Sequence, residues 1–133
     1  MVAELSRPAL DLGIVTDDAT RTLAFWRDTL GLEPDGELPF PGIGVVHRLR
    51  CGESAVKVLA LERPAAARAP GGGFTAATGL RYCTLHVANL DAVVAACRTR
   101  GYAVPVAVRP LRAGLRVAMV EDPDGNTVEL IGP

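Results

Sequence analysis

The hydrophobic and polar positions of the chain follow the same order twice. Residues 10–16 (LDLGIVT) form a short apolar run that predicts a strand, and a helical pattern follows it as far as Gly31. Residues 80–88 (LRYCTLHVA) predict a second such strand, and a helical pattern follows it as far as Gly101. We therefore expect two similar halves, each opening with a strand and a helix.

Both predicted helices have a capping residue at the start and an apolar stripe along one side. The N-cap is Asp17 or Asp18 in the first helix, and Asn89 or Asp91 in the second. The apolar stripes consist of Leu23, Phe25, Trp26 and Leu30 in the first helix, and of Val93, Val94 and Cys97 in the second. Such a stripe is typical of a helix that packs one side against a sheet.

Three strand candidates follow each helix. In the first half they are residues 32–38, 43–50 and 55–61. In the second half they are residues 102–108, 115–121 and 127–131. Residues 32–38 (LEPDGEL) are a poor strand sequence, whereas the DPDGN sequence before residue 127 is a strong turn signal. The order strand, helix, three strands in each half predicts an α+β fold, in which two paired βαβββ modules form a curved mixed sheet around a cleft, with the helices outside.

Residues 63–79 separate the two halves. This stretch (RPAAARAPGGGFTAATG) contains two prolines and a run of three glycines, a composition typical of a flexible loop. We expect a single domain over residues 1–133, with one module at about 9–62, the linker at 63–79 and the other module at about 80–132.

Charge and composition exclude several partners. The chain has 14 Lys and Arg against 15 Asp and Glu, and only 5% of its residues are aromatic. A net charge of −1 gives no reason to expect nucleic acid or an anionic membrane, and the low aromatic content argues against stacking on bases. No run of apolar residues is long enough to span a membrane.

The three cysteines help to predict the cellular compartment of the protein. Cys51, Cys83 and Cys97 form no C-x-x-C pair, and the N-terminal residues show no apolar core of a signal peptide. We therefore expect reduced thiols in a cytoplasmic protein.

The two halves resemble the vicinal oxygen chelate superfamily, the group of glyoxalases, bleomycin-resistance proteins and dioxygenases. The resemblance rests on LDLGIVTDD and LAFWRDTLGL in the first half, and on LRYCTLHVANLDAV and EDPDGNTVEL in the second. It covers about residues 9–132, and the DPDGN-x-x-EL pattern near the end is its most specific part. The resemblance implies a small-molecule ligand and a homodimer.

The same resemblance implies a metal site that is incomplete in this chain. The family usually takes one ligand from the first strand of each module and one from a later strand. The matching positions hold Asp11, Tyr82, Glu129 and an apolar residue, Val58 or Leu59. A phenol has a pKa near 10 and seldom binds a divalent metal, and two carboxylates are too few for Zn²⁺, Ni²⁺ or Fe²⁺. We expect no resident metal, with a weakly held divalent ion as the alternative.

The alternation of side chains along a strand predicts one group of candidate site residues. Tyr82, Thr84 and His86 share the polar face of the predicted strand at 80–88. Glu129 stands at a family ligand position, so we expect it in the same cleft, as a general base or as the acceptor of a hydrogen bond from Tyr82. His86 is expected to be a ligand contact or a proton carrier. The candidate catalytic residues are thus Glu129, Tyr82 and His86, with Thr84 as a ligand contact.

A second group comes from the predicted hairpin at residues 45–61. A short turn would pair Arg48 with Lys57 on one face, where they would suit a carboxylate, phosphate or enolate oxygen, with Asp11 nearby. A one-residue bulge would instead turn His47 inward. The alternative is that these are exposed charges of an edge strand that discourage aggregation.

Two functions agree with these residues. The first is a binding protein similar to the bleomycin-resistance branch, which holds a small molecule in its cleft without a metal. The second is a lyase, an isomerase or epimerase, or a dioxygenase of the same superfamily, which uses Glu129 as base with a weak divalent metal. The missing metal ligands favour the first function.

Overall fold

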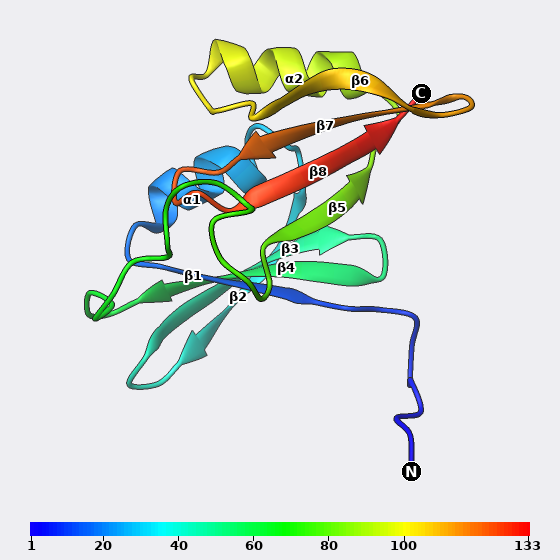
Figure 1. The fold of residues 1–133 in the computed structure, drawn as a ribbon. Helices are drawn as coiled ribbons and strands as arrows, with labels where there is room; N and C mark the ends of the chain where they lie inside the picture. The colour runs from blue at the N-terminus through cyan, green and yellow to red at the C-terminus, as the bar shows by residue number, and fades with distance from the viewer. The chain divides into compact units, whose positions relative to one another are not determined.

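The computed structural model describes all 133 residues and divides the chain into two compact units, Met1–Ala66 and Ala67–Pro133. Each unit holds one four-stranded sheet and one helix (Figure 1). The α+β class and the βαβββ order of each half are confirmed, and the boundary between the units lies within the predicted linker at 63–79.

The first unit consists of β1 (Leu12–Thr16), α1 (Ala19–Trp26), β2 (Glu33–Phe40), β3 (Gly44–Cys51) and β4 (Ser54–Leu61). The strands lie in the order β1-β4-β3-β2, with β1 parallel to β4 and the other pairs antiparallel. The chain reaches β4 from β1 through α1, β2 and β3, because a parallel neighbour cannot be reached by a tight turn.

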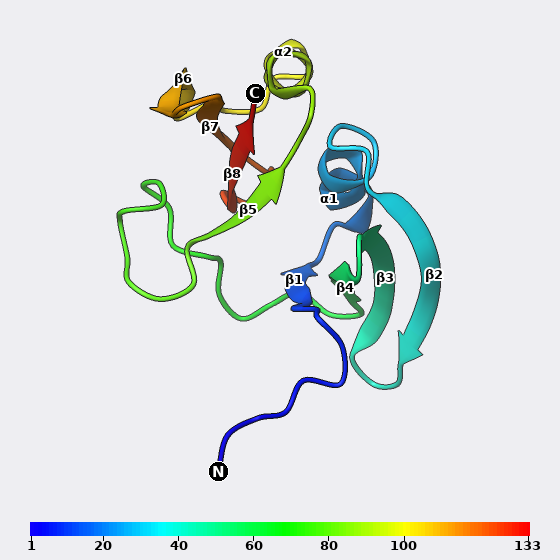
Figure 2. The ribbon, with the colours of Figure 1, turned by 90° about the vertical axis from the view of Figure 1, so that its right-hand side faces the viewer.

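The core of the first unit lies between α1 and one face of this sheet (Figure 2). Phe25 and Trp26 are fully buried on α1, and Val58 is fully buried on β4. The other buried apolar side chains of this unit are Ile14, Leu23, Leu49, Ala55 and Val56. The predicted apolar stripe of the first helix is therefore the side that packs.

Helix α1 begins where the sequence predicts and ends earlier. Asp18 is the N-cap, and its carboxylate accepts a hydrogen bond from the backbone N–H of Arg21 at 3.1 Å. Beyond Trp26 the bonding is mixed. The backbone N–H groups of Arg27 and Thr29 bond to the carbonyl groups of Leu23 and Phe25 four residues back, and those of Asp28 and Leu30 bond to the same two carbonyl groups five residues back. The regular α-helix therefore ends at Trp26 and does not continue to Gly31.

Strand β2 is more regular than its sequence indicates. All eight residues from Glu33 to Phe40 are exposed at the edge of the sheet, and the register against β3 shifts between Pro34 and Glu37. The strand forms despite Pro34 and Pro39 because an edge strand needs only part of its N–H groups for pairing. Its poor strand sequence reflects this exposed position.

The second unit consists of β5 (Tyr82–His86), α2 (Leu90–Thr99), β6 (Val106–Arg112), β7 (Leu115–Glu121) and β8 (Thr127–Gly132). The strands lie in the order β5-β8-β7-β6, with β5 parallel to β8. Helix α2 packs on β7 and β8. The side chains with at most 1% exposure in this unit are Leu90, Val94, Cys97, Ala118, Val120, Val128 and Leu130.

Strand β6 lies later in the chain than the predicted strand at 102–108. The backbone N–H of Tyr102 closes the end of α2 by bonding to the Cys97 carbonyl, and Pro105 has no N–H to offer a partner strand. The register of β6 is instead set by its hairpin with β7, in which Arg112 pairs with Leu115.

The DPDGN turn before β8 is held by its first residue. Asp122 is only 4% exposed, and its carboxylate accepts hydrogen bonds from the backbone N–H groups of Asp124 and Asn126 at 2.9 and 2.8 Å. The side-chain amide of Asn126 donates a third, at 2.9 Å. This closed turn fixes where β8 begins and therefore which of its side chains share a face.

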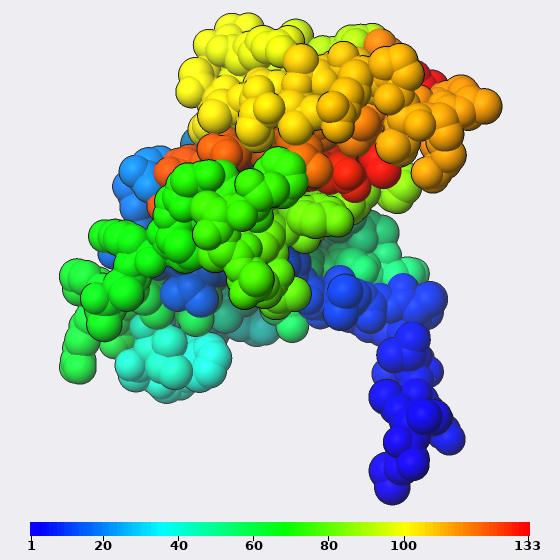
Figure 3. All heavy atoms as spheres, in the orientation of Figure 1, coloured from blue at the N-terminus to red at the C-terminus, as the bar shows by residue number.

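Residues 1–8 are exposed and form an extended segment that leaves the sheet of the first unit, dark blue in Figure 3. Neither helix has the length and apolar character of a membrane span. The three cysteines are free thiols, and burial raises the pKa of the Cys97 thiol.

Candidate functional site

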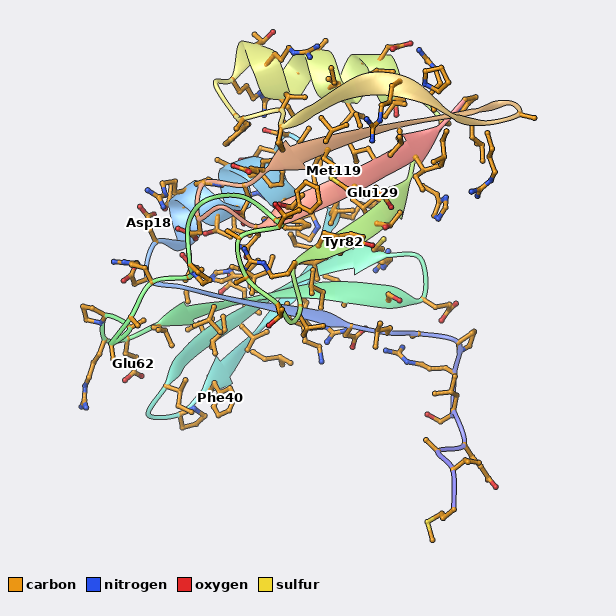
Figure 4. The ribbon with its side chains drawn as sticks, in the orientation of Figure 1. Asp18, Phe40, Glu62, Tyr82, Met119 and Glu129 are labelled. Carbon is orange, nitrogen blue, oxygen red and sulfur yellow. The ribbon has the colours of Figure 1, made fainter.

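Glu129 lies in the middle of β8, between Thr84 on β5 and Met119 on β7. Residues that pair directly across a sheet point to the same side, so these three side chains share one face. Val128 and Leu130, which point to the other face, are fully buried on the side of α2. The face with Glu129 is therefore turned away from the helix, and we call it the open face of the second sheet; Figure 4 labels Tyr82, Met119 and Glu129.

The carboxylate of Glu129 has a protein partner. Thr84 Oγ1 donates a hydrogen bond to Glu129 Oε1 at 2.7 Å. The sequence places both residues in the site, and of its two alternatives for Glu129, a general base or an acceptor from Tyr82, the second names a different donor. Thr84 takes this place because the parallel register sets it directly beside Glu129, whereas Tyr82 pairs with Thr127 two residues earlier on β8.

Tyr82 contacts the linker instead. Tyr82 is 57% exposed as a residue, and its ring meets the ring of Phe74 edge to face, with the ring centres 6.4 Å apart. The guanidinium of Arg81 donates hydrogen bonds to the carbonyl groups of Gly73 and Phe74 at 2.9 and 3.3 Å. Residues 73 and 74 of the linker are thus held against the start of β5, and they add an aromatic residue, Phe74, that no pattern in the sequence predicts for the site.

His86 lies at the far end of β5 on the same open face. It pairs with Ile131 and is exposed, and the structure shows no hydrogen bond or ion pair of its side chain. Its expected role as a ligand contact or proton carrier stays a prediction.

In the first unit, the carboxylate of Asp11 has a partner at each of its two oxygens. Its Oδ1 accepts a hydrogen bond from the backbone N–H of Ala55 at 2.8 Å, and its Oδ2 lies 3.2 Å from Lys57 Nζ. The guanidinium of Arg7 is farther away, at 3.9 Å. The hydrogen bond from Ala55 and then that from Lys57 hold the pKa of Asp11 below its ordinary value.

Arg48 and Lys57 share a face, as the sequence predicts. The two residues pair directly in the β3–β4 ladder, and Lys57 also pairs with Gly13 of β1. This is the face away from α1, because Leu49 and Val58, which point to the other side, are at most 1% exposed. The structure shows no hydrogen bond or ion pair of the Arg48 side chain, which is partly exposed.

His47 lies on the opposite face from Arg48. The β3–β4 register is continuous from Gly44 to Cys51, so the bulge that would turn His47 toward Arg48 and Lys57 is absent. His47 Nδ1 lies 3.3 Å from Glu37 Oε1 on the neighbouring strand β2. His47 therefore does not face a ligand held by Arg48 and Lys57.

The residues at the family's metal positions do not suit a metal. Within the structure no three His, Cys, Asp or Glu side chains come together as a ligand set. Asp11 is already neutralised by an ammonium group that would repel a cation, and Glu129 already accepts a hydrogen bond. Tyr82 offers a phenol where the family usually has an imidazole.

The sequence profile of the Glyoxalase/Bleomycin resistance protein/Dioxygenase superfamily matches residues 9–130. Since this is most of the chain, the protein belongs to that superfamily. A search of curated protein sequences found no match. The superfamily commonly uses divalent metals, and its members bind small molecules and are often dimeric.

Solved structures with the same fold include proteins of different kinds. A glyoxalase family protein from Bacillus cereus is 16% identical with a TM-score of 0.78, covering 99% of this chain and 98% of the other. The trypanothione-dependent glyoxalase I of Leishmania major is 20% identical with a TM-score of 0.72, covering 96% and 87%. TnmS3, an antibiotic binding protein from Streptomyces sp. CB03234, is 20% identical with a TM-score of 0.67, covering 100% and 99%. At these identities the likeness concerns the fold alone, and function has to be argued from the site.

Proposed function

We propose that this protein binds a small molecule on the open face of its second sheet and that it does so without a resident metal ion. One observation carries the proposal: each carboxylate at a family ligand position is already engaged by a protein donor, Asp11 by Lys57 and Glu129 by Thr84. A carboxylate that is oriented by a neighbouring hydroxyl is better placed to accept a hydrogen bond from a ligand than to join a metal.

The side chains around Glu129 indicate what kind of molecule would fit. Glu129 Oε2 has no partner in the protein, so it can accept a hydrogen bond from a ligand hydroxyl, amide or ammonium group. Met119 and Tyr82 share the same face and are accessible, so they offer apolar contacts, whereas Val117 and Ile131 on this face are already buried. The ligand would therefore be a mostly apolar molecule with at least one hydrogen-bond donor, a description that fits many antibiotics and secondary metabolites.

The second candidate is an enzyme of the same superfamily, a lyase, an isomerase or epimerase, or a dioxygenase. The free oxygen of Glu129 supports it, because a partly exposed carboxylate with one oriented oxygen can take a proton from a bound substrate. Tyr82 and His86 would then assist from the same face, and a weakly held divalent ion could add to the site. We rank this candidate second because the hydrogen bond to Glu129 comes from Thr84, and neither Tyr82 nor His86 is hydrogen-bonded to it.

We also propose that the protein is a cytoplasmic homodimer. The resemblance to the superfamily supports the dimer, and the three free thiols support a reducing compartment. Sedimentation velocity of the purified chain at several concentrations tests the dimer.

A metal titration tests the metal-free site. The purified protein is incubated with Mn²⁺, Ni²⁺ or Zn²⁺, desalted, and analysed for bound metal by mass spectrometry. We expect no stoichiometric metal, in the wild type and in the E129Q variant alike. One tightly bound ion per chain that disappears in E129Q would overturn the metal-free proposal.

A ligand screen by two-dimensional NMR separates binding from catalysis. Compounds that contain a donor group and an apolar body are expected to shift amide signals of β5 and β8 and to be recovered unchanged. E129Q and T84V should weaken them, whereas E121Q, which changes a carboxylate at the end of the same face, should not. Conversion of a compound to a product that needs Glu129 would instead support the enzyme.

A further inference from the structure

The open face of the first sheet, the one turned away from α1, carries a continuous apolar row. Residues that pair directly across the four strands form this row, in the order Val15, Leu59, Val46, Leu38. Val15 and Leu38, at its two ends, are 57% and 54% exposed. Apolar side chains aligned across a whole sheet and left in contact with water indicate a surface that receives an apolar partner.

The next row extends this apolar surface. Phe40 of β2 pairs with Gly44 of β3, which pairs with Leu61 of β4. Phe40 is 46% exposed and points away from α1 in Figure 4. Gly44 is buried, and the backbone of Ala60 and Leu61 fills the space that a side chain would need, so β3 adds no side chain between Phe40 and Leu61. Together the two rows form what we call the apolar half of this face.

The charged half lies on the other side of the apolar row. Lys57 and Arg48 come first, two residues along their strands from Leu59 and Val46, and Arg50 follows. Lys57 is paired with Asp11, and Arg50 is paired with Glu33 and Asp35 at 3.2 and 3.0 Å. Arg48 is therefore the cation of this half that has no counter-ion, and it borders directly on the apolar half.

We propose that the open face of the first sheet binds an amphiphilic organic acid, with its carboxylate on Arg48 and its apolar body over Val46, Leu59 and the row beyond. An unpaired guanidinium presents parallel N–H groups that match a carboxylate, and Lys57 lies next to it as a second cation. Val46 and Leu59 give the apolar body its contact area. This assignment does not depend on the ligand of the second sheet, because it rests on different strands.

The strand geometry also sets the size of the acid. Rows on one face of a sheet are about 7 Å apart, because each step covers two residues of about 3.3 Å. An acid anchored at Arg48 therefore needs an apolar body of about 7 Å to reach the first apolar row and about 14 Å to cover both. Medium-chain fatty acids and aryl-alkyl acids have this length, whereas acetate cannot touch either row.

A second copy of the chain fits this face less well than a small acid. A symmetric dimer that covers the apolar row through the same surface of both copies would also bring the two Arg48 side chains into the interface. Two guanidinium groups would then lose water without gaining a counter-ion, which is unfavourable. A small anion neutralises Arg48 and covers the apolar row at the same time.

The experiment is a titration of the ¹⁵N-labelled full-length protein with sodium decanoate below its micelle concentration, followed by two-dimensional NMR. We expect saturable shifts of the amide signals of Val46, Arg48 and Leu59. Acetate, which has no apolar body, and decyltrimethylammonium, which has the opposite charge, are expected to leave these signals in place. R48Q should weaken decanoate about tenfold, the loss of one charge-assisted interaction.

Matched variants distinguish the outcomes. R50Q removes a cation from the same strand and face, but one that already has counter-ions, so decanoate affinity should stay at the wild-type value. L59S should weaken decanoate while its spectrum remains that of the folded protein. Equal binding of decanoate and decyltrimethylammonium, or equal loss in R48Q and R50Q, would overturn the proposal, as would decanoate shifts confined to β5 and β8. A dimer that L38K dissociates, in a protein that does not respond to decanoate, would assign this face to a second copy instead.

Discussion

Lys57 Nζ lies 3.2 Å from Asp11 Oδ2, so the residue just before β1 is joined to β4 by an ion pair, beside the ladder that joins the two strands. The backbone N–H of Ala55 donates to the other oxygen of the same carboxylate at 2.8 Å. At the position where the family resemblance places a metal ligand, this chain has an internal cation. Asp11 therefore joins two residues that are distant in sequence, Ala55 at 44 positions and Lys57 at 46 positions. Protonation of the Asp11 carboxylate is expected to affect the stability of the fold.

The first prediction concerns acid stability. Because the folded state lowers the pKa of Asp11, the stabilisation is fully present above the ordinary value of 3.8 and is lost as the pH falls through the lowered one. D11N keeps an acceptor for Ala55 but cannot titrate, so its urea midpoint should fall less than that of the wild type between pH 5 and pH 2. E4Q, in the exposed N-terminal segment, is the control and should follow the wild type. A D11N curve parallel to the wild-type curve over this range would contradict the assignment.

The second prediction compares the two helix N-caps. Asp18 accepts a hydrogen bond from the Arg21 backbone, whereas the side chain of Asn89 makes no capping bond. D18A should therefore lower the free energy of unfolding by about 1 kcal/mol, within a usual range of about 0.5–2 kcal/mol, and N89A should lower it by less. Chemical denaturation of both variants under the same conditions measures the difference, and an equal loss would show that the Asp18 bond contributes little.

The third prediction concerns the turn before β8. D122A removes the acceptor of three hydrogen bonds at a buried position, so we expect a loss of about 1–3 kcal/mol or more in the free energy of unfolding. D122N keeps one oxygen for the two backbone N–H groups and should recover part of this loss. Thermal unfolding of both variants provides the measurement. Identical melting temperatures for D122A and the wild type would mean that the turn does not need its carboxylate.

The fourth prediction tests the core of the second sheet. Leu130 is fully buried on the face that receives α2, whereas Leu111 on β6 is 42% exposed. L130A should cost about 2–5 kcal/mol, through lost burial and the cavity left behind, and L111A should cost about 0.5 kcal/mol or less. The difference between the two urea midpoints is the readout, and a similar cost for both would contradict the facing of β8 on which the placement of Glu129 depends.

Most of the fold was predictable because buried elements leave a pattern in the sequence. Alternation in residues 55–61 and 127–131 follows from the need to bury one face, and the structure has β4 and β8 there. The limits of β2 were harder to predict, because a solvated edge strand has no apolar alternation to read. The position of β6 depends on its pairing with β7, which is a non-local property.

The sequence predicts which side chains of the candidate site share a face of a sheet, but it does not predict which of them bond to one another. Period-two alternation correctly put Thr84 with Tyr82 and Arg48 with Lys57. Two contacts, the hydrogen bond from Thr84 to Glu129 and the ion pair of Asp11 with Lys57, depend on which strands lie side by side and in which register. In each contact the two residues are about a third of the chain apart in sequence. Phe74 was missed because it lies in a glycine-rich stretch, where no periodicity indicates what a side chain contacts.

The way each sheet is completed has a consequence for biosynthesis. All four strands of the first sheet come from residues before Ala66, and those of the second come from residues after Ala67. Once residue 66 has left the ribosome, the nascent chain holds every strand it needs to close its first ladder, so that half can become protease-resistant while the other is still being translated. The prolines of β2 then protect the exposed edge of an early intermediate from pairing with another nascent chain.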